Sequence, residues 1–540
     1  MPFSLEDNTV IYIKKDLMTM KKILLVFASF YKKSDLPEKK RIFWEPLGIA
    51  YLASYLRNNN YQVDIFFPLI KNMEEHDIKQ WLYENISKYS LVGLSTADFT
   101  CTSVKKYVSF IKELQFSGRI IVGGLGPTCN WREFVFPGID AVVIGEGEKT
   151  VLKIANSIRD NTSLTDIEGI AYLKNGTPYR NGYVELIENL DDNVFPARDI
   201  SEKFLEQFDI NQIHIQIQTS RGCLGKCSFC SIANFLQEQG SVKYRERSVE
   251  NIVSEIAYLN SRYGFKKFDF MDENFFPFSP TQSVEKCKRL ILELNKNHYD
   301  IQLFVQCHLK AISFELLELL SSINVTSIFV GIDSFQTDEL FIFNKNYSRS
   351  DVMAFLELVN NSPYSFNISS KYRMKTGFIN FTPISSLNML YENGIIFKQY
   401  NFSCKKLIRK LKMSVGNLLL LERIRKIFPD FSEDNYFMYP ETSRFYKELT
   451  LFYELYEEVR GNLRNIENIY MNDVNSIPLR MISDITTLRE KTDELFFDYY
   501  FCKLNEIRES TNYKSNSIGI VKKCAVRKHP KSKIGMCQAT

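Results

Sequence analysis

The sequence lacks the features that would place it in a membrane, in an oxidising compartment or on a nucleic acid. No stretch reaches about 18 consecutive apolar residues, the length that a membrane-spanning helix needs, and no signal-peptide pattern is present. The formal net charge is only +4, which indicates no polyanionic partner. The 11 cysteines are scattered instead of forming a secreted disulfide framework. We therefore expect a cytoplasmic protein with no membrane span and no nucleic-acid partner.

The length and composition predict a folded protein of several domains. A chain of 540 residues is too long for one ordinary core, and about 150 residues per domain suggests three or four units. With 45% hydrophobic and 14% aromatic residues it has ample material for large cores and is not typical of a disordered chain. An apolar run follows shortly after Met20, so we expect residues 1–19 to be an N-terminal extension.

Residues 20–155 alternate short apolar runs with amphipathic stretches, which predicts an α/β domain built on a doubly wound, five-stranded parallel sheet. The expected strands are residues 23–28, 62–66, 91–95, 120–123 and 141–144. Two of these runs end in glycine-rich turns, at residues 123–128 and 145–150. Such sheets bind ligands at the carboxyl ends of their strands. The two turns together favour a ligand, although each alone could be a tight turn.

The rest of the chain divides into three further regions. Residues 156–206 are predicted to be a linker, with hairpin-like turns at Asn175-Gly176 and Asn181-Gly182. Residues 207–400 resume the alternation and predict a partial or full (β/α) barrel. Residues 401–540 are mainly helical in pattern and end in a basic tail. The expected strands of the barrel are residues 213–217, 267–271, 303–305, 327–331 and 376–382, and the expected helices include 249–263 and 313–322.

Three cysteines stand together directly after the first predicted barrel strand. Cys223, Cys227 and Cys230 lie within eight residues, and their thiolates are soft donors suited to zinc or an iron–sulfur cluster. A structural zinc site needs four protein ligands, whereas three ligands leave one position open for a substrate or cofactor. The alternatives are packing cysteines and a zinc site completed by His214 or His308.

The spacing Cys-x3-Cys-x2-Cys, with an aromatic residue before the last cysteine, resembles the signature of the radical S-adenosylmethionine (SAM) superfamily. The resemblance implies that the three cysteines bind three irons of a 4Fe-4S cluster and that SAM chelates the fourth. Reductive cleavage of SAM would then give a 5′-deoxyadenosyl radical that abstracts hydrogen from a substrate. The resemblance also implies SAM contacts from Phe229, Asp272, Glu273 and Asn380, although the acidic pair could instead be a solvated turn. At His308, where related chains often have arginine, we expect a structural histidine.

The first domain resembles the cobalamin-binding module that precedes many radical SAM domains. The segments that carry this resemblance are residues 46–53, 92–95, 123–128 and 144–148. The Asp-x-His-x-x-Gly motif, which supplies a cobalt ligand in some cobalamin proteins, is missing, and Gly126 stands where relatives often have histidine. The residues implied to bind cobalamin are Ser95, Thr96, Gly123, Gly124, Thr128, Gly145, Glu146 and Gly147.

The combined resemblance, to radical SAM enzymes with a cobalamin-binding domain, favours cobalamin-dependent C-methylation of a peptide or natural-product intermediate. A different radical rearrangement, cyclisation or oxidation remains open, because a fold does not fix a reaction. A non-catalytic iron–sulfur sensor or binding protein is the alternative from another class. The implied partners are a small-molecule or peptide substrate and an electron donor such as flavodoxin or ferredoxin. No catalytic side chain is assigned.

Overall fold

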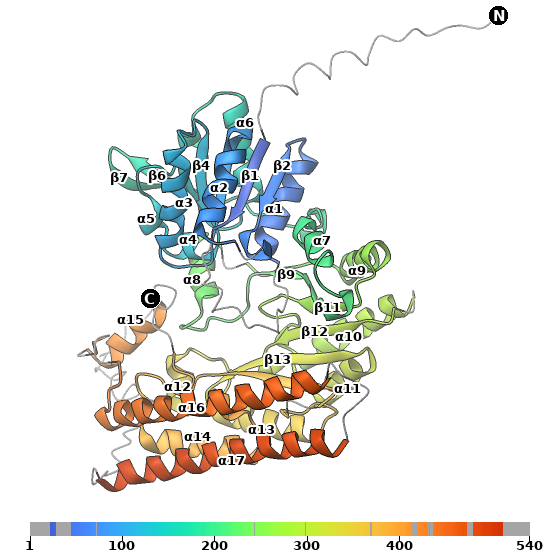
Figure 1. Ribbon diagram of the computed structural model, residues 1–540, viewed down its shortest axis with the longest axis vertical. Helices are drawn as coiled ribbons and strands as arrows, with labels where there is room; N and C mark the ends of the chain where they lie inside the picture. The colour runs from blue at the N-terminus through green and yellow to red at the C-terminus, as the bar shows by residue number, and fades with distance from the viewer. Residues whose placement is uncertain are drawn as a thin grey trace, which may run out of the picture.

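The computed structural model describes residues 22–28, 45–71, 73–241, 243–296, 299–367, 370–411, 418–429, 431–432, 436–471 and 479–510. The predicted N-terminal extension and basic tail lie outside these residues. Within them, a first α/β unit, a second α/β unit and a pair of long helices follow one another from top to bottom of Figure 1. No helix among the described residues is long and apolar enough to cross a membrane.

The first sheet has seven strands in the order β2-β1-β3-β4-β5-β6-β7. They are β1 (Lys22–Phe27), β2 (Val63–Phe66), β3 (Tyr89–Ser95), β4 (Arg119–Gly123), β5 (Ala141–Val143), β6 (Ile170–Lys174) and β7 (Thr177–Asn181). The first five are parallel, as predicted. The prediction of five strands was wrong by two, because β6 and β7 form a hairpin across Asn175-Gly176 and add to β5 in antiparallel fashion. Part of the expected linker is thus sheet.

Helices cover both faces of this sheet, which confirms the doubly wound prediction. Along β1, Ile23 and Leu25 join the apolar cluster on one face while Leu24 and Val26 join the cluster on the other. The first face is covered by α1 (Leu47–Asn58) and α6 (Glu148–Arg159), the second by α2 (Glu75–Asn85) and α3 (Thr102–Glu113).

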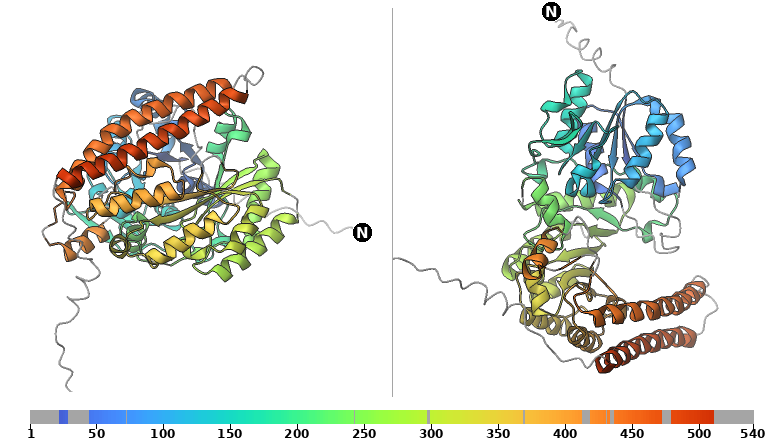
Figure 2. Two further views of the ribbon diagram at one scale, coloured as in Figure 1. Left: turned by 90° about the horizontal axis from the view of Figure 1, so that it is seen from below. Right: turned by 90° about the vertical axis from the view of Figure 1, so that its left-hand side faces the viewer.

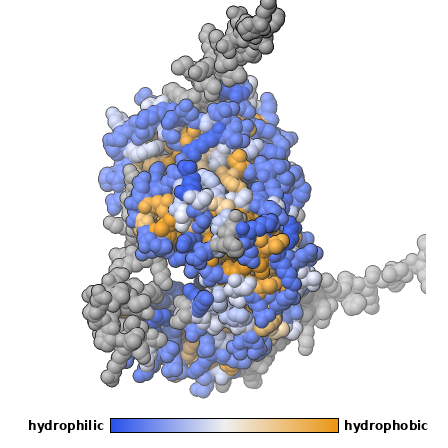
Figure 3. Space-filling model, turned by 90° about the vertical axis from the view of Figure 1, so that its right-hand side faces the viewer, coloured by the Kyte–Doolittle hydropathy of each residue, from blue (hydrophilic) through white to orange (hydrophobic). Residues whose placement is uncertain are grey.

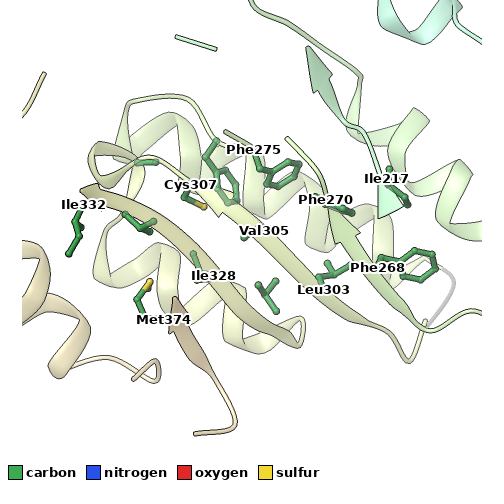
Figure 4. Packing of buried hydrophobic residues seen from close by; sticks show 14 of the residues in the cluster. Ile217, Phe268, Phe270, Phe275, Leu303, Val305, Cys307, Ile328, Ile332 and Met374 are labelled. Atoms are coloured by element: carbon green, nitrogen blue, oxygen red, sulfur yellow. The ribbon is translucent and has the colours of Figure 1, made fainter. Parts of the chain in front are cut away.

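The second sheet is a partial barrel of five parallel strands in the order β14-β13-β12-β11-β8. They are β8 (Ile215–Ile217), β11 (Lys267–Phe270), β12 (Gln302–Cys307), β13 (Val325–Asp333) and β14 (Arg373–Phe378). Figure 4 shows the face that the helices bury, where Phe268, Val305 and Ile328 come from three successive strands. The helices that follow the strands include α9 (Val249–Tyr263), α10 (Pro280–Asn295), α11 (Phe314–Ser322), α13 (Arg349–Asn360) and α14 (Leu387–Gln399).

The described part of the C-terminal region is mainly helical, as predicted. Its helices are α15 (Leu418–Ile427), α16 (Pro440–Met471) and α17 (Leu479–Ser510). The two long helices lie side by side, and α17 packs on α14 (Figures 1 and 2). Before them, the chain pairs with the segment that follows β14, where Phe381 N donates to Arg409 O and Leu411 N to Phe381 O. The helical region therefore closes one side of the barrel sheet.

The two α/β units share one continuous apolar core. Ile49 and Val151 of the first unit belong to the same buried cluster as Ile200, Ile213 and Val249. On the face shown in Figure 3 the surface is largely hydrophilic, and the apolar residues gather in patches near the middle of the molecule. The shared core fixes the first sheet against the loop that carries the three cysteines.

Candidate cofactor site between the two sheets

A cavity of about 340 Å³ lies between the carboxyl ends of the first sheet and the start of the barrel. Its lining is mostly apolar, which is typical of a cofactor pocket. Helix α8 (Ser231–Glu238) follows the cysteines and lines the cavity with Ile232, Phe235 and Leu236. The predicted site residues that line it are Ser95, Gly123, Gly124, Gly145, Glu146, Gly147 and Glu273.

The first glycine turn allows close approach of the backbone. Gly124 has φ of +110°, and a Cβ atom there would lie 2.5 Å from the carbonyl oxygen of Thr96. At Gly126 a Cβ atom would lie 1.7 Å from the carbonyl oxygen of Asp98. Position 126 therefore has no room for the histidine that relatives often carry, which gives a physical reason for its absence. A ligand beside this turn would meet backbone groups and short side chains.

Thr96 and Thr128 support the backbone of the loops that border the cavity. Both are buried, and neither lines the cavity. The hydroxyl oxygen of Thr128 accepts a hydrogen bond of 2.9 Å from Gly145 N, and that of Thr96 accepts one of 3.0 Å from Asp98 N. Their hydroxyl groups thus position the backbone around the cavity.

The three cysteines occupy a loop between β9 (Ser220–Arg221) and α8. A Cβ atom on Gly225 would lie 3.4 Å from Cys223 Sγ and 3.7 Å from Cys227 Sγ, and Cys230 is the N-cap of α8. Gly225 N and Asn274 Nδ2 donate hydrogen bonds of 3.3 and 3.2 Å to Cys223 Sγ. These donors favour a thiolate, which fits a cluster ligand.

The ligand role of the three cysteines stays a prediction. All nine cysteines in the described ranges are free, and no group of three or more His, Cys, Asp or Glu side chains there is arranged to hold a metal ion. Burial raises the pKa of Cys223, and burial together with Glu273 raises the pKa of Cys230 to about 12. Binding of iron would have to be coupled to deprotonation of these thiols.

The two histidines of the zinc alternative are engaged elsewhere. His214 Nδ1 lies 3.0 Å from Asp269 Oδ1. His308 stacks on Phe278 with ring centroids 3.8 Å apart, and its Nδ1 accepts a hydrogen bond from Lys310 N. These contacts are those expected of a structural histidine at position 308.

Asp272 and Glu273, the two acidic residues that were predicted to approach SAM, have different surroundings. Asp272 is buried and accepts hydrogen bonds from the backbone and hydroxyl groups of both Thr219 and Ser220, at 2.6 to 3.1 Å. It thereby fixes the start of the cysteine loop. Glu273 lines the cavity. Burial within the protein, with the nearby Asp272 carboxylate, raises the pKa of Glu273 to about 7.

Phe229 and Asn380 do not line the cavity. Phe229 packs edge-on against Phe343, with ring centroids 4.9 Å apart. Asn380 is buried, donates a hydrogen bond of 2.7 Å to Leu407 O and accepts one of 2.9 Å from Asn393 Nδ2. Because β14 ends at Phe378, earlier than predicted, Asn380 lies in the connection that joins the sheet to the helical region.

Sequence reasoning missed several contributors to the site, among them one helix face and one arginine. The apolar side of α8 was not predicted, although Ile232, Phe235 and Leu236 have helical spacing directly after Cys230. Arg221 was also missed, and it pairs with Glu146 and Glu148 across the cavity wall, with N–O distances of 2.8 and 2.6 Å. No local sequence pattern predicts an ion pair between two residues that are 75 positions apart.

Comparison with known families agrees with this arrangement. Residues 41–155 match the B12 binding domain family, and residues 217–368 match the Radical SAM superfamily. The fold and site thus define a radical SAM protein. The chain carries, more narrowly, a B12-binding domain ahead of a radical SAM domain. These two domains imply a 4Fe-4S cluster, SAM and cobalamin as cofactors.

Curated relatives match parts of the chain. An uncharacterized methyltransferase of Pyrococcus horikoshii is 27% identical over 299 residues, which cover 54% of this chain and 61% of that protein. The anaerobic magnesium-protoporphyrin IX monomethyl ester cyclase of a Synechocystis species is 24% identical over 238 residues, or 42% of this chain and 45% of the cyclase. The chain thus spans less than two thirds of either relative.

Solved structures share the fold over more of the chain. The cobalamin-dependent radical SAM enzyme OxsB, with aqua-cobalamin and SAM bound, superposes with a TM-score of 0.69 at 16% identity, over 89% of this chain and 72% of OxsB. The methyltransferase TsrM from Kitasatospora setae gives 0.56 at 15% identity, over 71% and 72% of the two chains.

Proposed function

We propose that the protein is an enzyme that reductively cleaves SAM at a 4Fe-4S cluster and uses cobalamin to methylate a carbon of a peptide or natural-product intermediate. The observation that carries the proposal is that residues of both domains line one cavity. The glycine turns of the B12-binding domain form one wall, and Gly222 and Glu273 of the radical SAM domain belong to the other.

The residues around the cavity fit the cofactors that the two domains imply. Cys223, Cys227 and Cys230 would hold the cluster, and the turns at Gly124 and Gly145 would let backbone groups approach the corrinoid. When bound, the cofactors supply the radical and the methyl group of the reaction. The apolar side of α8 would exclude water from the space between them.

A second candidate reaction has support from the relatives. The Synechocystis relative is a cyclase, whereas the Pyrococcus relative is a methyltransferase. A radical rearrangement, cyclisation or oxidation without methyl transfer would use the same cysteine loop. A cytoplasmic location and reduction by a flavodoxin or ferredoxin belong to the proposal in either case.

Cleavage of SAM is the first test. The purified protein would be reconstituted anaerobically with iron and sulfide, reduced with dithionite, and assayed for 5′-deoxyadenosine. We expect production in the wild type and loss of both product and visible cluster absorption in Cys227→Ala. Cys287→Ala, a buried cysteine outside the loop, and Cys502→Ala, an exposed one, should keep both. An intact cluster that yields no product would favour the iron–sulfur sensor instead.

Binding of cobalamin separates the two candidate reactions. The protein would be incubated with hydroxocobalamin, desalted, and its visible spectrum recorded. Retained corrinoid, together with formation of S-adenosylhomocysteine from SAM on reduction, is expected for a methyltransferase. Corrinoid that is lost on desalting would remove methyl transfer and leave the cyclase-like alternative.

A further inference from the structure

Arg221 joins the two cofactor loops. It stands two residues before Cys223, and its guanidinium reaches the B12-binding domain, where Nη1 lies 2.8 Å from Glu146 and Nη2 2.6 Å from Glu148. These carboxylates flank Gly147 in the second glycine turn. One arginine therefore bridges the turn that borders the cavity on one side and the cysteine loop that borders it on the other.

A second arginine completes this arrangement. Arg245, on β10 (Arg245–Glu246), is the direct cross-strand partner of Arg221 on β9. It pairs with Glu146 and donates a hydrogen bond of 2.5 Å to Ile187 O. Glu146 thus lies between two guanidinium groups, while within the described ion pairs Glu148 depends on Arg221.

Burial makes this bridge sensitive to geometry. The side chains of Arg221, Glu146 and Glu148 are 10%, 11% and 6% exposed. Arg221 Nε also donates to Gln218 Oε1 at 3.0 Å, and its guanidinium lies 5.1 Å from the ring centroid of Tyr51. Each of the three guanidinium nitrogens therefore donates a hydrogen bond. Lysine would keep the charge but could not reproduce the fork that binds two carboxylates.

We propose that Arg221 is a positioning residue that locks the 145–148 turn of the B12-binding domain against the cysteine loop. The radical SAM domain thereby sets the shape of the corrinoid side of the cavity. The part of this inference that concerns corrinoid affinity rests on the proposed function. The part that concerns the contact between the 145–148 turn and the cysteine loop, here called the lock, does not.

The lock is tested in the full chain without cofactors. Hydrogen–deuterium exchange would be measured for peptides covering residues 145–148 and 222–230 in the wild type and in Arg221→Lys. We expect at least about tenfold faster exchange in both segments, since charge-assisted hydrogen bonds to buried carboxylates are lost. Glu148→Gln, a milder change, should speed exchange less. Exchange that is unchanged in both variants would overturn the proposal.

Arg57→Lys is the matched control. Arg57 binds the single carboxylate of Asp199 through both Nη atoms, at 2.8 and 2.7 Å, and does not line the cavity. Its substitution should leave exchange at 145–148 and 222–230 at wild-type values. Acceleration equal to that of Arg221→Lys would show general loosening of the fold and contradict a specific lock.

The corrinoid readout then distinguishes the inference from the proposed function. Arg221→Lys should bind hydroxocobalamin at least about tenfold more weakly while iron content stays at the wild-type level. The electron paramagnetic resonance coupling between reduced cluster and cob(II)alamin should weaken as well. Wild-type affinity and coupling in the variant would overturn the inference. A wild type that binds no corrinoid would refute the proposed methyl transfer, and the exchange data would still decide whether the lock exists.

Discussion

The guanidinium of Arg198 lies 2.5 Å from the carboxylate of Glu45, and both side chains are buried. Arg198 also contacts Glu255 at 2.9 Å, and Glu255 in turn contacts Arg247 at 2.5 Å. Glu45 precedes Pro46, the N-cap of the first helix of the B12-binding domain, whereas Glu255 lies on α9 of the barrel. A buried chain of ion pairs therefore crosses the boundary between the two α/β units.

Replacement of Arg198 should destabilise the whole protein. Arg198→Met leaves the Glu45 carboxylate buried without its cation, and we expect a loss of about 3–5 kcal/mol in the free energy of unfolding. Urea unfolding followed by circular dichroism would measure it. Arg57→Met, which breaks a half-exposed pair with Asp199, should cost about 1 kcal/mol or less. Equal losses of stability in the two variants would show that the buried ion pairs contribute no more than the more exposed pair.

Introduction of a cobalt-ligating side chain at position 126 should fail. In Gly126→His the new Cβ atom would collide with the Asp98 carbonyl oxygen, so we expect a loss of at least about 3 kcal/mol and no axial histidine in the spectrum of bound corrinoid. A Cβ atom at Gly461, in α16, meets nothing within 4 Å. Gly461→Ala should therefore stabilise the chain by about 1 kcal/mol. A well-folded Gly126→His protein would refute the clash.

Removal of the Asp272 charge should impair cluster assembly. An asparagine at this position offers one acceptor oxygen and an NH₂ group that would face donors on Thr219 and Ser220. We expect Asp272→Asn to lose about 2–4 kcal/mol of stability and most of its reconstituted iron. Iron per chain and visible absorption would be compared with Asp269→Asn, whose carboxylate contacts a half-exposed histidine. Wild-type iron content in Asp272→Asn would show that the loop forms without this support.

His308 should make the protein sensitive to mild acid. Burial, followed by the charges of Lys345 and Lys310, lowers the pKa of His308 to about 3. Because the folded-state pKa lies below the unfolded value of about 6.5, the contribution of neutral His308 to stability is complete above pH 6.5. It is lost as the pH falls towards 3, at roughly 1.4 kcal/mol per pH unit.

The test of this dependence is a comparison of slopes. Urea midpoints between pH 7 and 5 should fall less steeply in His308→Asn, which keeps a capping acceptor for Lys310 N. The interpretation would be wrong if His308→Asn and the wild type had the same slope.

The elements that could be predicted from sequence are those with strong local signals. Helix α9 occupies the predicted residues 249–263 because Ser248 caps its start and Gly264 adopts the left-handed conformation at its end. The hairpin at Asn175-Gly176 was equally local. The attachment of this hairpin to β5 could not be predicted, since the turn residues pair two neighbouring strands but do not determine which sheet those strands join.

The candidate site divides in the same way. Glycine turns and the cysteine loop could be found because each is contiguous in the sequence. The ion pair of Arg198 with Glu45 spans 153 residues, and the role of Asp272 depends on the pairing of β11 with β8, beyond which Asp272 meets Thr219. Such relations arise from tertiary packing, which apolar periodicity and short motifs do not encode.

Helix α8 belongs to both halves of the cofactor site. Cys230 is its N-cap, and the helix packs on α4 (Leu125–Cys129) of the B12-binding domain, where Asn234 Nδ2 donates to Cys129 O at 3.4 Å. The B12-binding domain is consequently not an interchangeable module. A chimaera that took this domain from another protein would have to inherit α4 and α8 together, and any crossover between them would place an unmatched surface beside a cysteine of the loop.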